Sequence, residues 1–226
     1  MSKLKILIYA TLSVLPWSLR RRLLCAVFGF KIAPSAFVSR FALLLPSRLE
    51  MGPNSRIGAF TVCKGLQSLK LEENARIGSG NWITAFPLGT SSAHFELDTR
   101  RKPQLIVERH SAITNRHIID CTDEVRIGAF STFAGFRSQI LTHSIDLNES
   151  RQRCRPVCIG TYCFVGTSCV LLGGSVLPDR CVLAAQSLLS SAQELTDYYY
   201  GGVPAKPIKP VAANAKYFVR ASGYVW

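Results

Sequence analysis

The chain has 226 residues and a formal net charge of +13, from 27 Lys and Arg residues against 14 Asp and Glu residues. A hydrophobic content of 48% with few low-complexity runs excludes a disordered chain and is typical of a folded protein with one sizeable core. The positive charge favours polyanionic partners such as nucleic acid, an anionic membrane or a phosphate-bearing small molecule, without choosing among them.

Residues 1–31 predict an N-terminal helical segment. An apolar run over residues 6–19 is interrupted by Pro16 and followed by arginines at 20–22. This run is shorter than the roughly 20 apolar residues that a membrane-spanning helix needs. The arginines are also unlike the small residues of a signal-peptide cleavage site. Two interpretations stay open: helices that cap the main domain, and helices in peripheral contact with the inner face of a membrane.

An aliphatic residue recurs at every sixth position near the C-terminal end, and the same interval runs forward from Leu71 and from Val107. The longest series comprises Ile159, Val165, Leu171, Leu177, Leu183 and Leu189. Neither the helical period of 3.6 nor the strand period of two gives this interval. Three hexads, each a short strand and a sharp corner, close a triangular rung of 18 residues, and such rungs stack by parallel hydrogen bonding.

The pattern therefore predicts an all-β fold, a parallel β-helix over residues 32–200, followed by a C-terminal tail over residues 201–226. The aliphatic residue of each hexad points inward, and we expect glycine, asparagine or a small residue at the tight corners. Two polar, turn-rich segments at about 84–106 and 140–157 interrupt the repeat. We expect them to leave the coil as loops, where binding and catalytic residues concentrate.

The eight cysteines have two interpretations, a disulfide framework or reduced packing residues. Three of them, Cys163, Cys169 and Cys181, occupy the fifth position of their hexads, where a small residue is needed. This phase favours the packing interpretation, which also fits a reducing cytoplasm. No Cys-x-x-Cys pair occurs, so we expect no cysteine zinc site and no metal.

The hexads together with "YYYGGVPAKPIKP" (198–210) resemble the left-handed β-helix acyltransferases of the hexapeptide-repeat superfamily, most closely the sugar O-acetyltransferases of polysaccharide synthesis. The resemblance covers roughly residues 49–210. It implies a left-handed coil, a homotrimer with active sites between adjacent subunits, acetyl-CoA as the acyl donor, and a sugar or glycan precursor as the acceptor.

Two motifs carry the catalytic part of the resemblance. "THSID" (142–146) resembles the catalytic-histidine loop of the family, which implies that His143 is the general base. An imidazole suits this role because it titrates near neutrality. "TNRHIIDCTDEVRIG" (114–128) resembles the segment with an active-site asparagine five residues before an aspartate, here Asn115 and Asp120. Asn115 either binds the acceptor or the oxyanion, or only forms a turn.

Bulky polar residues stand where the hexad phase asks for small or aliphatic ones. His117 and Arg137 fall on fifth positions, and Gln139 falls on a first position. We interpret these three as acceptor-binding residues because functional sites break local rules. The alternative is a slip in register that makes Ile140 the inward residue. Asp146 either orients His143 and the acceptor or begins a turn.

The coenzyme-binding candidates lie near the C-terminal end of the coil. The corner "VGTSC" offers the backbone amides of Gly166, Thr167 and Ser168 to an oxyanion. Lys206 and Lys209, in a segment that resembles the coenzyme-proximal tail of the family, are candidate contacts for the coenzyme phosphates. Ala185, in "LAAQSLL", stands where the family commonly has a Gly-Ala-Gly-Ser-type turn.

Three other functions compete with that of a cytoplasmic sugar O-acetyltransferase. A zinc carbonic anhydrase of the same fold needs three convergent histidines, and the four histidines of this chain show no suitable spacing. A non-catalytic basic scaffold stays possible, although the basic residues are dispersed and nothing resembles a nucleic-acid module. An N-acetyltransferase of an amino sugar nucleotide would use the same base and coenzyme.

Overall fold

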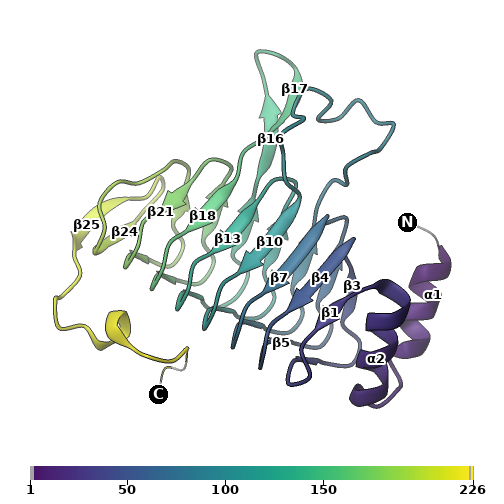
Figure 1. Ribbon diagram of the computed structural model, residues 1–226. Coiled ribbons are helices and arrows are strands. Elements are labelled where there is room, and N and C mark those ends of the chain that lie inside the picture. Colours follow the sequence, from purple (N-terminus) through teal and green to yellow (C-terminus); the bar gives the residue numbers. More distant parts are fainter. Residues whose placement is uncertain (1–2, 224, 226) are drawn as a thin grey trace.

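The computed structural model describes residues 3–223 and residue 225, and it shows a three-sided parallel β-helix with two helices at its N-terminal end (Figure 1). Residues 1, 2, 224 and 226, which belong to the expected terminal segments, lie outside the described residues.

Three sheets form the sides of the coil. Sheet A contains β1 (Lys31–Ile32), β4 (Arg48–Met51), β7 (Ser68–Leu71), β10 (Gln104–Val107), β13 (Val125–Ile127), β18 (Val157–Ile159) and β21 (Val176–Leu177). Sheet B contains β2 (Phe37–Val38), β5 (Arg56–Ile57), β8 (Arg76–Ile77), β11 (Ala112–Ile113), β14 (Thr132–Phe133), β19 (Phe164–Val165), β22 (Val182–Leu183), β24 (Tyr198–Gly201) and β25 (Lys206–Pro210). Sheet C contains β3 (Leu43–Leu45), β6 (Val62–Lys64), β9 (Trp82–Thr84), β12 (Ile118–Asp120), β15 (Gln139–Leu141), β20 (Val170–Leu172) and β23 (Leu188–Leu189).

Each rung consists of one strand from sheet A, one from sheet B and one from sheet C, and neighbouring rungs pair in parallel. Near the C-terminal end a rung has 18 residues, because Cys158 of β18 pairs with Val176 of β21. The first rung has 19 residues, because Lys31 pairs with Glu50. The six-residue interval thus marks one side of a triangle, as the sequence predicts.

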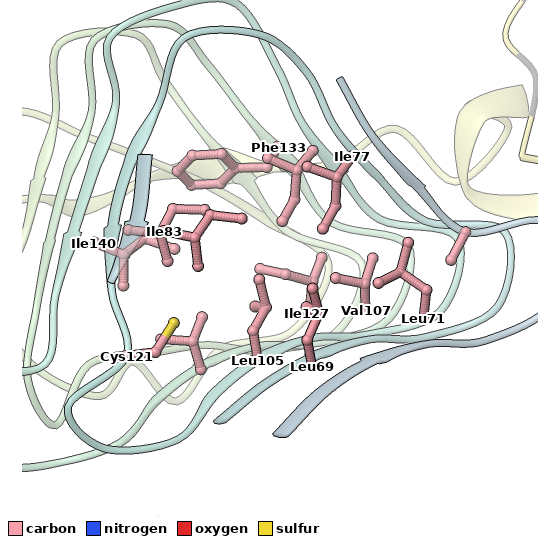
Figure 2. Close-up of a cluster of buried hydrophobic side chains, with 14 of the residues drawn as sticks. Leu69, Leu71, Ile77, Ile83, Leu105, Val107, Cys121, Ile127, Phe133 and Ile140 are labelled. Atoms are coloured by element: carbon pink, nitrogen blue, oxygen red, sulfur yellow. The ribbon is translucent and has the colours of Figure 1, made fainter. Parts of the chain in front are cut away.

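The core is a stack of inward side chains inside this triangle (Figure 2). Leu71, Ile77 and Ile83 come from the three sides of one rung, and each is at most 2% exposed. Burying one such side chain contributes roughly 2 kcal/mol. The corner cysteines Cys163 and Cys169 are also fully buried, and all eight cysteines are free thiols, in agreement with the packing interpretation.

The residues at the tight corners are larger than expected from the sequence. Many left-handed backbone positions belong to large side chains, among them Phe60, Phe130 and Tyr162. The rings of Phe130 and Tyr162 stack at 4.7 Å on successive rungs, so ring stacking between rungs accompanies the strained backbone. The recurring glycines serve close approach instead: a Cβ on Gly128 would lie 2.4 Å from the carbonyl oxygen of Gly160 in the next rung.

The two helices, α1 (Lys3–Leu12) and α2 (Trp17–Phe28), cover the first rung of the coil. Tyr9 and Leu24 are buried against it, and the indole N–H of Trp17 donates to the carbonyl oxygen of Ala36 at 2.9 Å. Arg20 is buried beneath the helices and donates to the carbonyl oxygen of Val38. Neither helix of the described chain has the length and apolar character needed to cross a bilayer.

The C-terminal tail closes the other end of the coil and then turns back. Strand β25 pairs antiparallel with β24 at the end of sheet B. A short 3-10 helix follows at Lys216–Val219, where the hydroxyl of Tyr217 donates to the carbonyl oxygen of Cys163 at 2.9 Å. The guanidinium of Arg220 donates to the carbonyl oxygen of Phe130. The tail therefore covers part of the outer face of sheet B.

Candidate functional site

Two insertions leave the coil at the same corner, between sheet C and sheet A. Residues 85–103 follow β9, and two rungs later a hairpin follows β15 (Figure 1). The hairpin consists of β16 (His143–Asp146) and β17 (Arg151–Cys154) in antiparallel pairing. The two segments that interrupt the repeat are thus extruded as expected, although the second is an ordered hairpin. Because rungs stack in register, insertions at one corner project side by side.

The inserted loop packs against the hairpin face that carries His143. The ring of Phe95 meets the imidazole of His143 edge-on, with 5.7 Å between the centroids. The carboxylate of Asp98 accepts a hydrogen bond of 2.9 Å from the backbone N–H of Cys154. His143 therefore lies between two inserted segments, with the ring of Phe95 against its imidazole.

The imidazole of His143 is bound to a buried carboxylate. Its Nδ1 lies 2.7 Å from Oδ2 of Asp120, which is only 7% exposed. Asp120 ends β12 and pairs with Leu141, the last residue of β15. The stacking of these strands therefore places the carboxylate directly against the residues with which the hairpin begins.

Five further hydrogen bonds hold the carboxylate of Asp120, one of them from the backbone N–H of His143 to Oδ2 at 3.2 Å. The hydroxyl of Thr122 donates to Oδ1 at 2.6 Å, and its backbone N–H donates to the same oxygen at 3.2 Å. The hydroxyl of Thr142 donates to Oδ2 at 2.6 Å, and its backbone N–H also donates there at 2.9 Å. Burial alone would raise the pKa of Asp120, but the hydrogen bonds from His143, Thr122 and Thr142 bring it below its ordinary value.

An ionised Asp120 defines the chemistry available to His143. The hydrogen bond to Asp120 raises the pKa of His143, and partial burial opposes this effect. Because a carboxylate can only accept, the neutral ring carries its proton on Nδ1 and leaves a lone pair on Nε2. The side chain is 41% exposed, so a substrate can reach it. This arrangement suits removal of a proton from a hydroxyl or an amine.

Arg101 fixes the loop above His143. Its guanidinium, in a residue only 9% exposed, donates to the carbonyl oxygen of Pro87 at 2.9 Å and lies 5.1 Å from the centre of the Phe95 ring. Phe95 also lines a cavity of about 400 Å³ between the loop and the hairpin. Ile145 and Gln152 of the hairpin line the opposite side of this cavity. The cavity therefore lies against the hairpin that carries His143, although the His143 side chain does not line it.

Asp146 does not orient His143. Its carboxylate accepts backbone hydrogen bonds from Asn148 and Glu149 at the hairpin turn, at 3.1 and 3.2 Å. It also lies 3.6 Å from Nε of Arg153. Asp146 therefore begins a turn, which was the second interpretation, and the orienting carboxylate is Asp120.

His117 is too deeply buried to bind an acceptor, and Gln139 does not occupy the inward position expected of it. His117 is 1% exposed, its Nε2 lies 3.0 Å from the hydroxyl of Thr114, and its Nδ1 accepts from the N–H of Ser138. Burial lowers the pKa of His117 to about 4, so it is a neutral packing residue inside the coil. Gln139 points outward, and Ile140 is the fully buried residue, which confirms the slip in register.

Asn115 and Arg137 lie at a different corner, between sheet B and sheet C. Oδ1 of Asn115 accepts a hydrogen bond of 2.6 Å from the N–H of Ser79 in the preceding rung, as a turn-forming residue does. Arg137 is exposed and has a left-handed backbone with φ of 60°. Sheet C separates this edge of the coil from the edge that carries His143. The structure therefore does not bring Asn115 and His143 together within one chain.

The coenzyme candidates Gly166, Thr167, Ser168 and Ala185 continue along the same edge as Asn115. The N–H of Gly166 donates to Leu183 at 2.8 Å, and that of Ser168 donates to Phe136 at 3.0 Å. These two amides are used by the coil, so neither is free to stabilise an oxyanion, contrary to the sequence-based expectation. Lys206 and Lys209 lie exposed on β25, at the C-terminal end of the coil.

Sequence reasoning missed the bond between Asp120 and His143, and it missed Phe95 and Arg101. The correct register between β12 and β15 would have revealed the bond between Asp120 and His143, because Asp120 pairs with Leu141, two positions before His143. Phe95 and Arg101 lie in an irregular loop that carries no repeat signal. Within the described part of the chain, no three His, Cys, Asp or Glu residues are grouped so that they could hold a metal ion.

Substitution of Asp120 by Asn should lower the pKa of His143, because the carboxylate that favours the imidazolium is removed. In the wild type we expect a pKa above the ordinary value of about 6.5. The measurement is an NMR titration of the His143 ring protons. The matched control is Asp146→Asn, which should leave the pKa of His143 nearly unchanged. A larger shift in the control than in Asp120→Asn would contradict the assignment.

No sequence-family model and no curated protein sequence matches the chain. Similar solved structures include AntD, an N-acyltransferase from Bacillus cereus in complex with dTDP and 3-hydroxybutyryl-CoA, with a TM-score of 0.50, 14% identity, and coverage of 85% of this chain and 88% of that one. The polysialic acid O-acetyltransferase OatWY gives a TM-score of 0.49 and 15% identity, with coverage of 82% and 87%. The hexapeptide-repeat containing acetyltransferase VCA0836 from Vibrio cholerae gives 0.46 and 17%, with 94% of both chains covered. At these identities the likeness to AntD shows that the two chains share a fold.

Proposed function

We propose that the protein is an O-acetyltransferase that moves an acetyl group from acetyl-CoA to a hydroxyl of a sugar or glycan precursor. The observation that carries this proposal is the pair formed by His143 and buried Asp120, with a bond of 2.7 Å, on a hairpin that also lines a cavity of about 400 Å³. A sugar hydroxyl is a weak nucleophile at neutral pH, so it needs a positioned base as it attacks a thioester.

His143 performs the two proton transfers of this reaction. Its Nε2 takes the proton of the acceptor hydroxyl while the oxygen forms a bond to the acetyl carbonyl. The resulting imidazolium is stabilised by Asp120, which holds the ring by Nδ1. When the carbon–sulfur bond breaks, the imidazolium returns the proton to the thiolate of the coenzyme. The base is thus restored and the products are an ester and a free thiol.

The edge between sheets B and C fits an anionic coenzyme. Its corner segments contain no Asp or Glu from the first rung to the last (residues 39–42, 58–61, 78–81, 114–117, 134–138, 166–169 and 184–187). The same segments include Arg40, Arg116 and Arg137. The corresponding edge between sheets A and B carries several acidic residues, among them Glu72 and Asp179. We therefore assign the coenzyme to the edge without carboxylates, with Lys206 and Lys209 at its C-terminal end.

His143 and this coenzyme edge lie on opposite sides of sheet C, so the proposal requires a second copy of the chain. The outward column of sheet C is apolar over most of its length, and Trp82 and Ile118 in it are 46% and 47% exposed. Sheet A instead bears ion pairs such as Arg126 with Glu108, and the tail partly covers sheet B. We propose a homotrimer of left-handed coils in which sheet C contacts a neighbour, so that His143 meets the neighbour's coenzyme edge.

Substitution of His143 by Asn should reduce turnover by about a hundredfold or more, because Asn cannot accept the proton at the position of Nε2. The assay measures thiol release from acetyl-CoA with a panel of sugar acceptors. Treatment with hydroxylamine separates an ester product from an amide, and a stable amide would indicate N-acetylation instead. The matched control, His110→Asn, changes a histidine at a distant corner and should keep wild-type turnover. Equal turnover in both variants would remove His143 from the mechanism.

Substitution of Ile118 by Arg should break the trimer and abolish turnover together, because a charge enters the apolar column of sheet C and the active site needs two copies. Light scattering after gel filtration gives the mass, and thiol release gives the activity. Ile106→Arg, on the outward face of sheet A, is the control and should preserve both. A monomeric Ile118→Arg variant with full turnover would show that one chain holds a complete site.

A further inference from the structure

Apart from Thr11, the described side chains of helix α1 (residues 6–12) are aliphatic or aromatic. Tyr9 is buried against the coil, while Ile6 and Leu7 are 40% and 62% exposed. Ala10 and Thr11 continue the exposed stripe, and Val14 in the following turn is 69% exposed. A helix that is hydrophobic all round is normally buried on every side. No described residue therefore covers the outer side of α1 at Ile6 and Leu7.

Helix α2 presents a similar outer side. Leu24 and Arg20 face the coil and are buried, whereas Leu19 and Val27 are 46% and 55% exposed. Arg22 lies on the same exposed side of the helix. The exposed apolar residues of both helices lie at the N-terminal end of the coil (Figure 1), and we call this set the cap patch. The cap patch comprises Ile6, Leu7, Val14, Leu19 and Val27.

Every charged side chain in the N-terminal part of the chain is positive. The first 49 residues contain no Asp or Glu, and the first acidic residue is Glu50. The same 49 residues contain eight basic ones: Lys3, Lys5, Arg20, Arg21, Arg22, Lys31, Arg40 and Arg48. The rest of the chain has the remaining 19 basic residues (27 minus 8) against all 14 acidic ones. The N-terminal end thus holds +8 of the net charge of +13.

Arg22, Arg40 and Arg48 are exposed, so this charge reaches solvent. At this end of the coil Glu50 lies 3.4 Å from Nζ of Lys31, and the other seven basic residues of the first 49 have no acidic neighbour in that segment of the sequence. Exposed aliphatic side chains with an excess of basic residues match the surface of an anionic bilayer, where apolar groups enter the acyl boundary and arginines meet phosphates. A second copy of the same end would bring positive charge against positive charge, which opposes self-association. The capping and membrane interpretations of the helices are therefore compatible, because one face packs on the coil and the other is free.

We propose that the cap patch docks the protein onto the surface of a bilayer that contains anionic phospholipid, without crossing it. Apolar burial and electrostatic attraction both contribute, so binding should weaken with added salt and with the loss of either component. The assignment is independent of the acetyl-transfer chemistry, because the cap patch lies at the first rung and the hairpin with His143 leaves the coil after β15. A protein inactive in the acyltransferase assay can still show this binding.

The experiment is co-flotation of the full-length protein with vesicles of phosphatidylcholine alone or of phosphatidylcholine mixed with phosphatidylglycerol. The wild type should float with the mixed vesicles and much less with phosphatidylcholine alone. Val14→Glu should reduce the partition coefficient about tenfold or more, because a carboxylate enters both the apolar and the basic region. Its position in an exposed turn makes the substitution compatible with folding, which a thermal melt checks.

The matched control is Val219→Glu, which changes the same residue type at 68% exposure, close to the 69% of Val14, but at the C-terminal end. This control should bind the mixed vesicles as the wild type does. Equal loss of binding in both variants would mean that a negative charge anywhere suffices, and it would overturn the cap patch. No binding by the wild type would also overturn it. A lower mass of Val14→Glu without lipid would show that a second copy covers the patch instead.

Discussion

The register between rungs is the constraint on which the other features of this protein depend. Because the strands pair in parallel, each residue stands beside the residue at the same position of the next rung, as Ile127 does beside Ile159. Residues far apart in sequence are thereby fixed at contact distance. Asp120 meets His143 because of this pairing, and the inserted loop meets the hairpin because both leave the same corner two rungs apart. The position of a residue within its rung therefore determines which residues of the neighbouring rungs it contacts.

The six-residue interval predicted most of the inward positions of the coil. The prediction was wrong by one position after Phe133, because the side between Phe133 and Ile140 has seven residues instead of six. Phe133 and Ile140 are inward neighbours in the chain although they are seven positions apart, not six. The longer corner accommodates the ring of His117 in the rung before it, whose Nδ1 accepts from Ser138. A bulky residue in one rung therefore changes the length of the next. The extra residue cannot be recognised from one hexad alone. A count of six from Phe133 therefore gives Gln139 as the inward residue, whereas the buried residue is Ile140.

Other features could not follow from local pattern. Phe95 reaches His143 only because a loop of irregular backbone folds back over the hairpin, and Arg101 holds it there through backbone carbonyls. Neither contact is marked in the sequence by a repeat or a motif. The sequence shows the recurring glycines but not why glycine is needed at those positions. Gly128 is needed because the next rung passes within 2.4 Å of where its Cβ would be. Close approach between rungs is a property of the stack rather than of the turn.

The proposed chemistry is divided between the two edges of one sheet. One edge holds an oriented imidazole between two insertions, and the corner segments of the other contain no Asp or Glu. An apolar column runs between them on sheet C, with Trp82 and Ile118 half exposed. Such a division would account for the separation of Asn115 from His143 in a single chain. It also gives the apolar column a role, since contact between copies there would join the two halves of the site.

The central claim is that ionised Asp120 holds the proton of neutral His143 on Nδ1 and keeps Nε2 free to act as a base. The most direct test is ¹⁵N NMR of the imidazole nitrogens of His143 at a pH above its pKa. The bond of 2.7 Å to Asp120 predicts a protonated Nδ1 and an unprotonated Nε2. A spectrum with the proton on Nε2, or with the two tautomers equally populated, would contradict the account.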